Sequence, residues 1–225
     1  MYSRAIVREA NSDSANALPQ AEPPGFSAAL KLLQEVNARL LDLLAFESQP
    51  TNAPRLPLAI ELGEILRQMD SGARARTAAC QFLLVDAGFQ DLQRWSRVGC
   101  EIELANDRAG CFLRPQAIEL AHMTFVLAWS LTRSNREAAC VMLGLAPGCA
   151  EIVANLRLQD LQRIAILHNA WIRPRWEGRP DIWRHILRTA NAPKSPAEAA
   201  ASLHGLQLFF GNVLVSETSE HVQHL

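Results

Sequence analysis

The sequence lacks several patterns that would assign it to common protein classes. Its five cysteines are an odd number and include no Cys-x-x-Cys pair, which argues against a secreted disulfide framework and a zinc knuckle. No stretch approaches the ~18 apolar residues of a membrane span, and residues 1–10 have no apolar core of signal-peptide length. We therefore expect a cytoplasmic protein in a reducing compartment, with no membrane partner.

Motifs of enzymatic chemistry are also missing. There is no Gly-x-x-x-x-Gly-Lys phosphate loop, no Gly-x-Ser-x-Gly elbow and no His-Glu-x-x-His zinc helix. The six histidines are scattered, and His221 with His224 fits a loose tail better than a metal site. We predict no catalytic residue, no metal ligand, no cofactor and no small-molecule substrate.

Net positive charge is scarce over the whole chain but concentrated in one part of it. The formal net charge of -1 argues against a protein held on nucleic acid by bulk charge alone. Residues 1–70 carry six basic and nine acidic residues, whereas residues 157–188 carry seven arginines against three acidic residues. The C-terminal part therefore holds a local positive excess of four charges.

The apolar pattern predicts an all-α fold, arranged as a multi-helix bundle with a helix-turn-helix-like C-terminal half. Apolar residues recur at spacings of three and four, while strand-like alternation is rare and best at residues 102–104. The predicted helices outside the helix-turn-helix stretch cover residues 27–46, 58–69, 73–85, 91–98, 180–189 and a long run that starts at 115.

Composition and pattern divide the chain into four regions. Residues 1–25 are polar and proline-rich, which predicts a flexible arm. Residues 26–112 form an N-terminal helical region, either a degenerate repeat or a partner-binding part. Residues 113–190 form the predicted DNA-binding and dimerisation domain, and residues 191–225 a tail with one short helix.

The stretch from residue 134 to residue 165 predicts three short helices joined by tight turns. Ser134 and Glu137 have the spacing of a capping box at the start of the first helix. Gly144 supplies the left-handed residue that ends it, and Pro147 suits the first turn of the next helix. A third amphipathic run begins near Leu158. Such a pattern is typical of a helix-turn-helix, which lays one helix in the DNA major groove.

These segments resemble the FlhD family, the D subunits of the flagellar master transcription activator and relatives that switch on integrative conjugative elements. The resemblance covers residues 118–190. The matching pieces are residues 127–134, 138–145, 150–156, 158–165 and 174–176. It implies an all-helical homodimer that activates transcription with an FlhC-like subunit carrying a four-cysteine zinc site.

This chain departs from the family pattern at two places. Val141 and Met142 stand where the family commonly has Phe-Arg, so one expected cationic contact is missing. Ile172 stands where the family has a cysteine, and the resemblance therefore implies no intersubunit disulfide there.

Double-stranded DNA is the predicted partner, since arginine pairs bidentately with phosphate and with the guanine edge. The candidate DNA-binding residues are Arg136, Arg157, Arg163, Arg173, Arg175, Arg179 and Arg184, of which Arg175 falls on a family motif. The alternative is a helical protein-interaction adaptor that binds no DNA. Its candidate partner-binding residues are Trp171, Trp176 and Trp183, because buried tryptophans dominate many interfaces.

Overall fold

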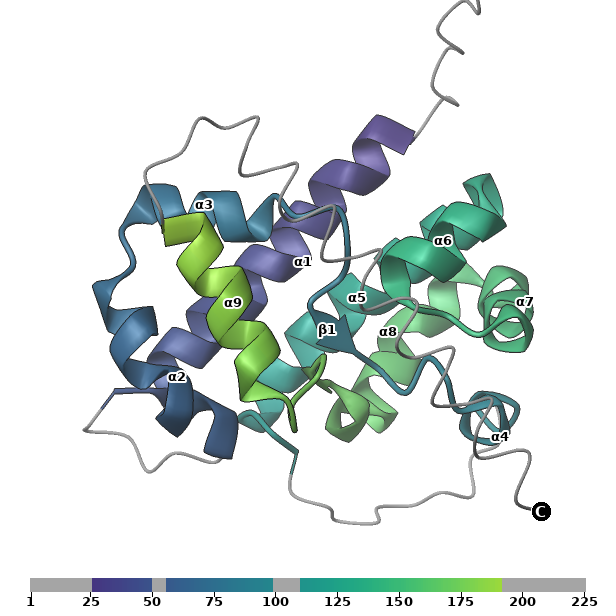
Figure 1. Ribbon diagram of the computed structural model, residues 1–225. Coiled ribbons are helices and arrows are strands. Elements are labelled where there is room, and N and C mark those ends of the chain that lie inside the picture. The colour runs from purple at the N-terminus through teal and green to yellow at the C-terminus, as the bar shows by residue number, and fades with distance from the viewer. Residues whose placement is uncertain (1–25, 50–55, 99–109, 192–225) are drawn as a thin grey trace, which may run out of the picture.

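Helices form nearly all the regular structure of the computed structural model, which describes residues 26–49, 56–98 and 110–191. The first half contains α1 (Phe26–Glu47), α2 (Pro57–Gln68), α3 (Ser71–Ala78), β1 (Val85–Asp86) and α4 (Leu92–Trp95). The second half contains α5 (Arg114–Ser134), α6 (Arg136–Leu143), α7 (Pro147–Asn155), α8 (Leu158–Leu167), the 3-10 turn η1 (Asn169–Trp171), β2 (Arg173–Pro174) and α9 (Pro180–Asn191) (Figure 1). The prediction of an all-α multi-helix fold is confirmed.

Helix α1 lies at the centre of the packing because its apolar residues cover more than one side. Its buried residues include Leu33, Leu40 and Leu44, and none of these three is more than 1% exposed. The helix packs against α2, α3 and α5, so three neighbours share its apolar surface. Burial of apolar area stabilises the fold by about 25 cal/mol per Å², so the many buried side chains of α1 make a large hydrophobic contribution.

The predicted boundary between residues 112 and 113 does not divide the core. Helix α9, from the C-terminal side of that boundary, packs across α2 and α3 (Figure 1). The Arg184 guanidinium lies 2.7 Å from Glu61, and Arg76 Nε donates to the Ala190 carbonyl over 2.8 Å. Strands β1 and β2 pair antiparallel, with Val85 opposite Pro174. The two predicted regions therefore share one hydrophobic core.

The predicted helix over residues 73–85 is too long. Helix α3 ends at Ala78, and the chain then runs in extended and bent form to β1. The apolar residues of this segment, Phe82, Leu83 and Leu84, are each at most 2% exposed, so they are buried without being helical. An apolar run of this length fits a buried helix and a buried extended segment equally well, and only a tertiary contact decides between the two.

The predicted capping box at Ser134 is wrong by one residue. Ser134 is the last residue of α5, and its hydroxyl donates to the Leu131 carbonyl over 3.1 Å. Asn135 is the N-cap of α6, and its Oδ1 accepts a 2.9 Å hydrogen bond from the Ala138 amide. Asparagine caps as well as serine, so the helix start itself was correctly predicted.

Several predictions fall outside the described residues. The N-terminal arm at residues 1–25, the strand candidate at 102–104 and the tail beyond residue 191 all lie there. They stay predictions.

The extended segment after α3 is held by one buried asparagine. Asn37 on α1 has 0% exposed surface. Its Nδ2 donates to the Phe82 carbonyl over 3.0 Å and to the Ala78 carbonyl over 3.3 Å, and its Oδ1 accepts from the Leu84 amide over 2.8 Å. Buried backbone groups outside regular structure need such partners. The Asn37 amide therefore replaces the hydrogen bonds that a longer α3 would have supplied.

We expect Asn37→Ala to lower the free energy of unfolding by about 2–4 kcal/mol, because it leaves at least two buried backbone groups without a partner. Urea unfolding followed by circular dichroism measures this. Gln34→Ala, an exposed position one turn earlier, serves as the control and should stay within about 0.5 kcal/mol of the parent. Equal stability of the two variants would contradict the role assigned to Asn37.

Candidate nucleic-acid interface

Helices α6 and α7 form the predicted helix-turn-helix. Three residues, Gly144 to Ala146, join them, and the chain bends by 118° between the two helices. A turn of this length and an angle of about 90–120° are typical of helix-turn-helix units. Gly144 adopts the left-handed conformation with φ 71°, and α7 begins at Pro147, as the sequence predicted.

The inner side of this turn is covered by the chain that runs from α3 to α4. The contacts are hydrogen bonds from the Leu83 amide to the Met142 carbonyl (2.8 Å), from the Ala146 amide to the Phe89 carbonyl (3.0 Å) and from Gln90 Nε2 to the Gly144 carbonyl (2.5 Å). Two of them satisfy the Met142 and Gly144 carbonyls at the end of α6, and the third gives a partner to the Ala146 amide just before α7. The N-terminal region therefore fixes the position of the turn.

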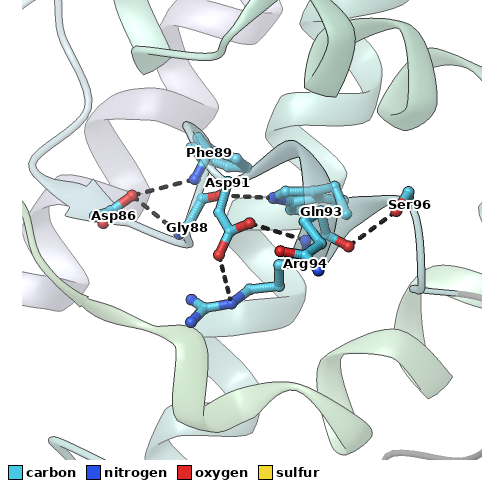
Figure 2. Close-up of polar contacts among 8 residues, drawn as sticks. Asp86, Gly88, Phe89, Asp91, Gln93, Arg94 and Ser96 are labelled. Atoms are coloured by element: carbon cyan, nitrogen blue, oxygen red, sulfur yellow. Dashed lines mark hydrogen bonds and ion pairs between the residues drawn. The ribbon is translucent and has the colours of Figure 1, made fainter. Parts of the chain in front are cut away.

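The loop between β1 and α4 is shaped by two aspartates (Figure 2). Asp86 Oδ1 accepts from the Gly88 and Phe89 amides at 3.0 and 3.4 Å. Asp91 caps α4 by accepting from the Arg94 amide at 2.9 Å, and its other oxygen lies 3.4 Å from Arg94 Nε. Short polar side chains of this kind stabilise tight turns and helix starts. The loop therefore delivers α4 to a defined place beside α7.

Helix α4 partly covers the N-terminal end of α7. A Cβ added at Gly148 would lie 2.9 Å from Leu92 Cδ1, so the Leu92 side chain packs directly on the glycine. The exposed residues of α7 are Pro147, Glu151 and Asn155, and the helix contains no lysine or arginine. Since Glu151 repels phosphate, α7 by itself presents no cationic face to DNA.

Positive charge instead flanks the helix-turn-helix at the two helix junctions. Arg136 begins α6, and Arg157 precedes α8; both are exposed. Arg133, which was not predicted from the sequence, stacks over the Trp129 ring at 5.0 Å and donates to the Ala154 carbonyl over 3.3 Å. That hydrogen bond joins the α5–α6 junction to the end of α7. The sequence held one signal that could have identified Arg133: it lies in the last turn of α5, directly before the predicted helix-turn-helix.

Four of the predicted DNA-binding arginines are engaged in ion pairs within the chain. The pairs are Arg157–Asp160 (2.8 Å), Arg173–Glu177 (3.3 Å), Arg179–Asp181 (3.0 Å) and Arg184–Glu61 (2.7 Å). Each is at least partly exposed, so each contributes little stability. Three of these carboxylates are the acidic residues already counted within residues 157–188, so only Glu61 on α2 lowers the local positive excess further, from four charges to three. Of the remaining predicted positions, Arg163 lies exposed on α8.

Arg175 points into the protein, although the sequence placed it among the DNA contacts. Its guanidinium carbon lies 4.7 Å from the centre of the Trp176 ring, and Nη1 donates to the Leu83 carbonyl over 3.4 Å. Burial lowers the pKa of the guanidinium, and the neighbouring Asp86 carboxylate opposes that change. In this position the side chain has a structural role, so we leave it out of the DNA-contact surface.

The three predicted partner-binding tryptophans occupy different positions. Trp183 has 0% exposed surface and donates from Nε1 to the Arg175 carbonyl over 2.7 Å, so within this chain it is a core residue. Trp171 is partly buried and stacks on His168 with ring centres 4.1 Å apart. Trp176 is partly buried too, with its ring edge-on to Phe82. Within the chain, the three rings therefore contribute to the core to different extents.

Neither a metal site nor a membrane helix is found in the described segments. No group of three His, Cys, Asp or Glu side chains there could hold a metal ion. None of the helices in these segments is individually long and apolar enough to cross a membrane; α6 and α7 meet that test only as a bent pair.

Burial raises the pKa of Cys80 to about 12 and that of Cys149 to about 11, so both stay protonated at neutral pH.

Comparisons with protein-family models, with curated proteins and with solved structures found no match to this chain. The fold therefore defines the class alone: an all-α, multi-helix protein. The resemblance to the FlhD family continues below as a proposal.

We expect Gly144→Ala to lower the free energy of unfolding by about 2 kcal/mol or more. A left-handed alanine alone costs roughly 1–2 kcal/mol, and the new Cβ would also clash with the Arg175 guanidinium. Urea unfolding measures the loss. Gly178→Ala is the matched control, because an added Cβ meets nothing within 4 Å. A loss of the same size at Gly178 would contradict this explanation.

The Arg179–Asp181 pair predicts a pH dependence. The hydrogen bond from Arg179 holds the pKa of the Asp181 carboxyl below its usual 3.8. A lowered pKa stabilises the fold above the unfolded-state value, and this contribution disappears as pH falls through the folded-state value. Arg179→Gln should therefore raise the pKa of Asp181 in an NMR titration. Arg188→Gln, in the last turn of α9, should leave it unchanged.

Proposed function

We propose that this chain is a DNA-binding transcriptional activator subunit of the FlhD type. It acts as a homodimer together with an FlhC-like zinc-containing subunit. The observation that supports this most is the geometry of α6 and α7, which meet at 118° through a three-residue turn that contains Gly144. The order of the helices along residues 118–190 is the order that the resemblance implies.

The proposed DNA contact centres on the arginines that flank the helix-turn-helix. Arg133, Arg136 and Arg157 are exposed, and the contact of Arg133 with Ala154 brings the two helix junctions together. Arg157 would exchange its pair with Asp160 for a phosphate, which its 72% exposed side chain permits. Arginines in such positions bind phosphates, which set the register of the protein on the duplex without reading sequence. Reading of the bases then falls to α7, whose exposed Asn155 offers its amide oxygen and the second N–H of Nδ2 to an adenine edge, while the first N–H is donated to the Glu151 carbonyl over 3.0 Å.

The need for a second subunit follows from the charges. Arg157, Arg173, Arg179 and Arg184 each face a carboxylate of the same chain. Affinity for DNA depends on the number of phosphates neutralised, and one chain offers few arginines for that purpose. Dimerisation doubles these contacts, and a partner subunit adds its own. Tight specific binding is therefore a property of the assembly.

A second candidate function has its own supporting observation. Helix α8 exposes Leu158 at 56%, Ile166 at 40% and Leu167 at 53%, and Val141 on α6 is 62% exposed. A helix that exposes several large apolar side chains offers contact area to other proteins. A helical adaptor that binds proteins and no DNA would use this surface, whereas the DNA-binding subunit would use it for assembly.

Genome-wide crosslinking and immunoprecipitation of the tagged chain in its native host tests the proposal. We expect a small number of sharp peaks near promoters. The variant Arg136→Gln with Arg157→Gln should lose most of this occupancy, because two phosphate contacts disappear. The experiment works without a defined operator or partner, because the crosslinked fragments themselves identify the binding sites.

The matched control is Lys31→Gln with Arg188→Gln, which removes two exposed cations from α1 and α9. Its peaks should equal those of the parent. A flat profile for the expressed parent chain, with partner proteins still recovered from the same cells, would reject DNA binding and favour the adaptor. Equal loss in both double variants would reject the assigned arginines.

A further inference from the structure

The Arg175 side chain meets parts of the chain that are far apart in sequence. Its backbone amide donates to the Leu84 carbonyl over 2.7 Å, and its guanidinium reaches the Leu83 carbonyl. The same guanidinium lies against Gly144: a Cβ built there would be 2.8 Å from the guanidinium carbon. One planar cation therefore fills the space between the extended segment after α3 and the turn that ends α6.

The backbone around Arg175 is fixed on both sides. Trp183 Nε1 donates to the Arg175 carbonyl, which ties the residue to the buried face of α9. The next residue, Trp176, is the only described non-glycine residue with positive φ, at 55°. A residue in this sparsely populated region persists only where its surroundings determine it strongly. The backbone at Arg175 is therefore held in one position, and this limits where its side chain can reach.

The location of the charge matches the end of a helix. Helix α6 ends at Leu143 with Gly144 as its C-cap, and its last carbonyls carry the negative end of the helix dipole. A cation at a helix C-terminus stabilises that end, and the planar guanidinium offers five N–H donors to carbonyls around it. The three atoms nearest to a Cβ built at Gly144 all belong to the Arg175 guanidinium, so this cation is the one that meets the cap.

We propose that Arg175 is a positioning residue of the helix-turn-helix, which holds the end of α6 and its turn in place without touching DNA. Its guanidinium joins the turn to the segment that Asn37 anchors, and so fixes the angle at which α7 is presented. This inference rests on the proposed DNA-binding function for its consequence in DNA recognition. The holding of the turn itself is independent of that function.

The first test measures the turn without DNA, in the full chain. In Arg175→Met, amide hydrogen exchange should accelerate roughly tenfold or more at Leu83 and Ala146, the amides that bond Met142 and Phe89. The amide of Leu40 in the centre of α1 should keep its rate. Arg175→Lys keeps the charge but loses the planar fork, and should give a smaller acceleration. Uniform acceleration at all three amides would overturn the positioning role.

A double-variant cycle tests the contact directly. Gly144→Ala should destabilise the chain less in the Arg175→Met background than in the parent, because the clashing guanidinium is gone. The effect of Gly178→Ala should be the same in both backgrounds. An unchanged effect of Gly144→Ala would show that the guanidinium does not hold the turn. If Arg175→Met does not fold, Arg175→Lys provides the same comparison.

The last test uses the assembled complex with two probes, the promoter fragments recovered by immunoprecipitation and a mixed-sequence duplex. In Arg175→Met the preference for the promoter fragments should fall several-fold, while the salt dependence of binding stays as in the parent. A direct phosphate contact would instead reduce the slope of log affinity against log salt by about 0.9. That reduction would overturn the inference. A parent complex without DNA affinity would reject the proposed function, and the exchange rates would still decide the role of Arg175 at the turn.

Discussion

The hydrogen bonds of the buried Asn37 amide are the interaction on which the rest of the structure depends. They hold the backbone from Ala78 to Leu84 in a non-helical path through the core, where water cannot satisfy it. That path leads the chain past the end of α6, so that the Leu83 amide meets Met142, and then into β1. A single polar group on the central helix therefore determines where the N-terminal region meets the helix-turn-helix.

Most of the helices could be predicted from sequence because their signals are local. Apolar spacing located α1, α2, α5 and α9, and the glycine and proline at residues 144 and 147 located the turn between α6 and α7. The errors arose where a distant residue decides the outcome. The apolar run after Ala78 has the pattern of a continued helix. It is not helical because Asn37, some forty residues earlier, forms hydrogen bonds with its backbone. The pairing of β1 with β2 was not predicted either, because strands of two residues leave almost no pattern in the sequence.

The candidate site was less predictable because residue type does not reveal what a side chain faces. The match of residues 174–176 to a motif of the FlhD family placed Arg175 among the predicted DNA contacts, yet this arginine fills a space that the missing Cβ of Gly144 leaves open. The sequence is equally compatible with Trp183 as a core residue or as an interface residue, and only its burial on the inner face of α9 distinguishes the two. Arg133 gained its importance from the Ala154 carbonyl, which lies in another helix. The sequence identifies the basic residues, but only the packing shows which of them face solvent.

The positive excess of residues 157–188 is best understood through its ion pairs. Exposed pairs of this kind contribute about 0–1 kcal/mol each, so stability alone gives little reason to have so many. Their stronger effect is on a polyanion, because a phosphate must displace a carboxylate before it gains a guanidinium. Arg184 is an example: its ion pair with Glu61 connects α9 to α2, so a phosphate that displaced Glu61 would also break this link. Such a surface disfavours non-specific adhesion of one chain to a polyanion. Under the proposed function, affinity for DNA would then depend on the cations that several chains present together.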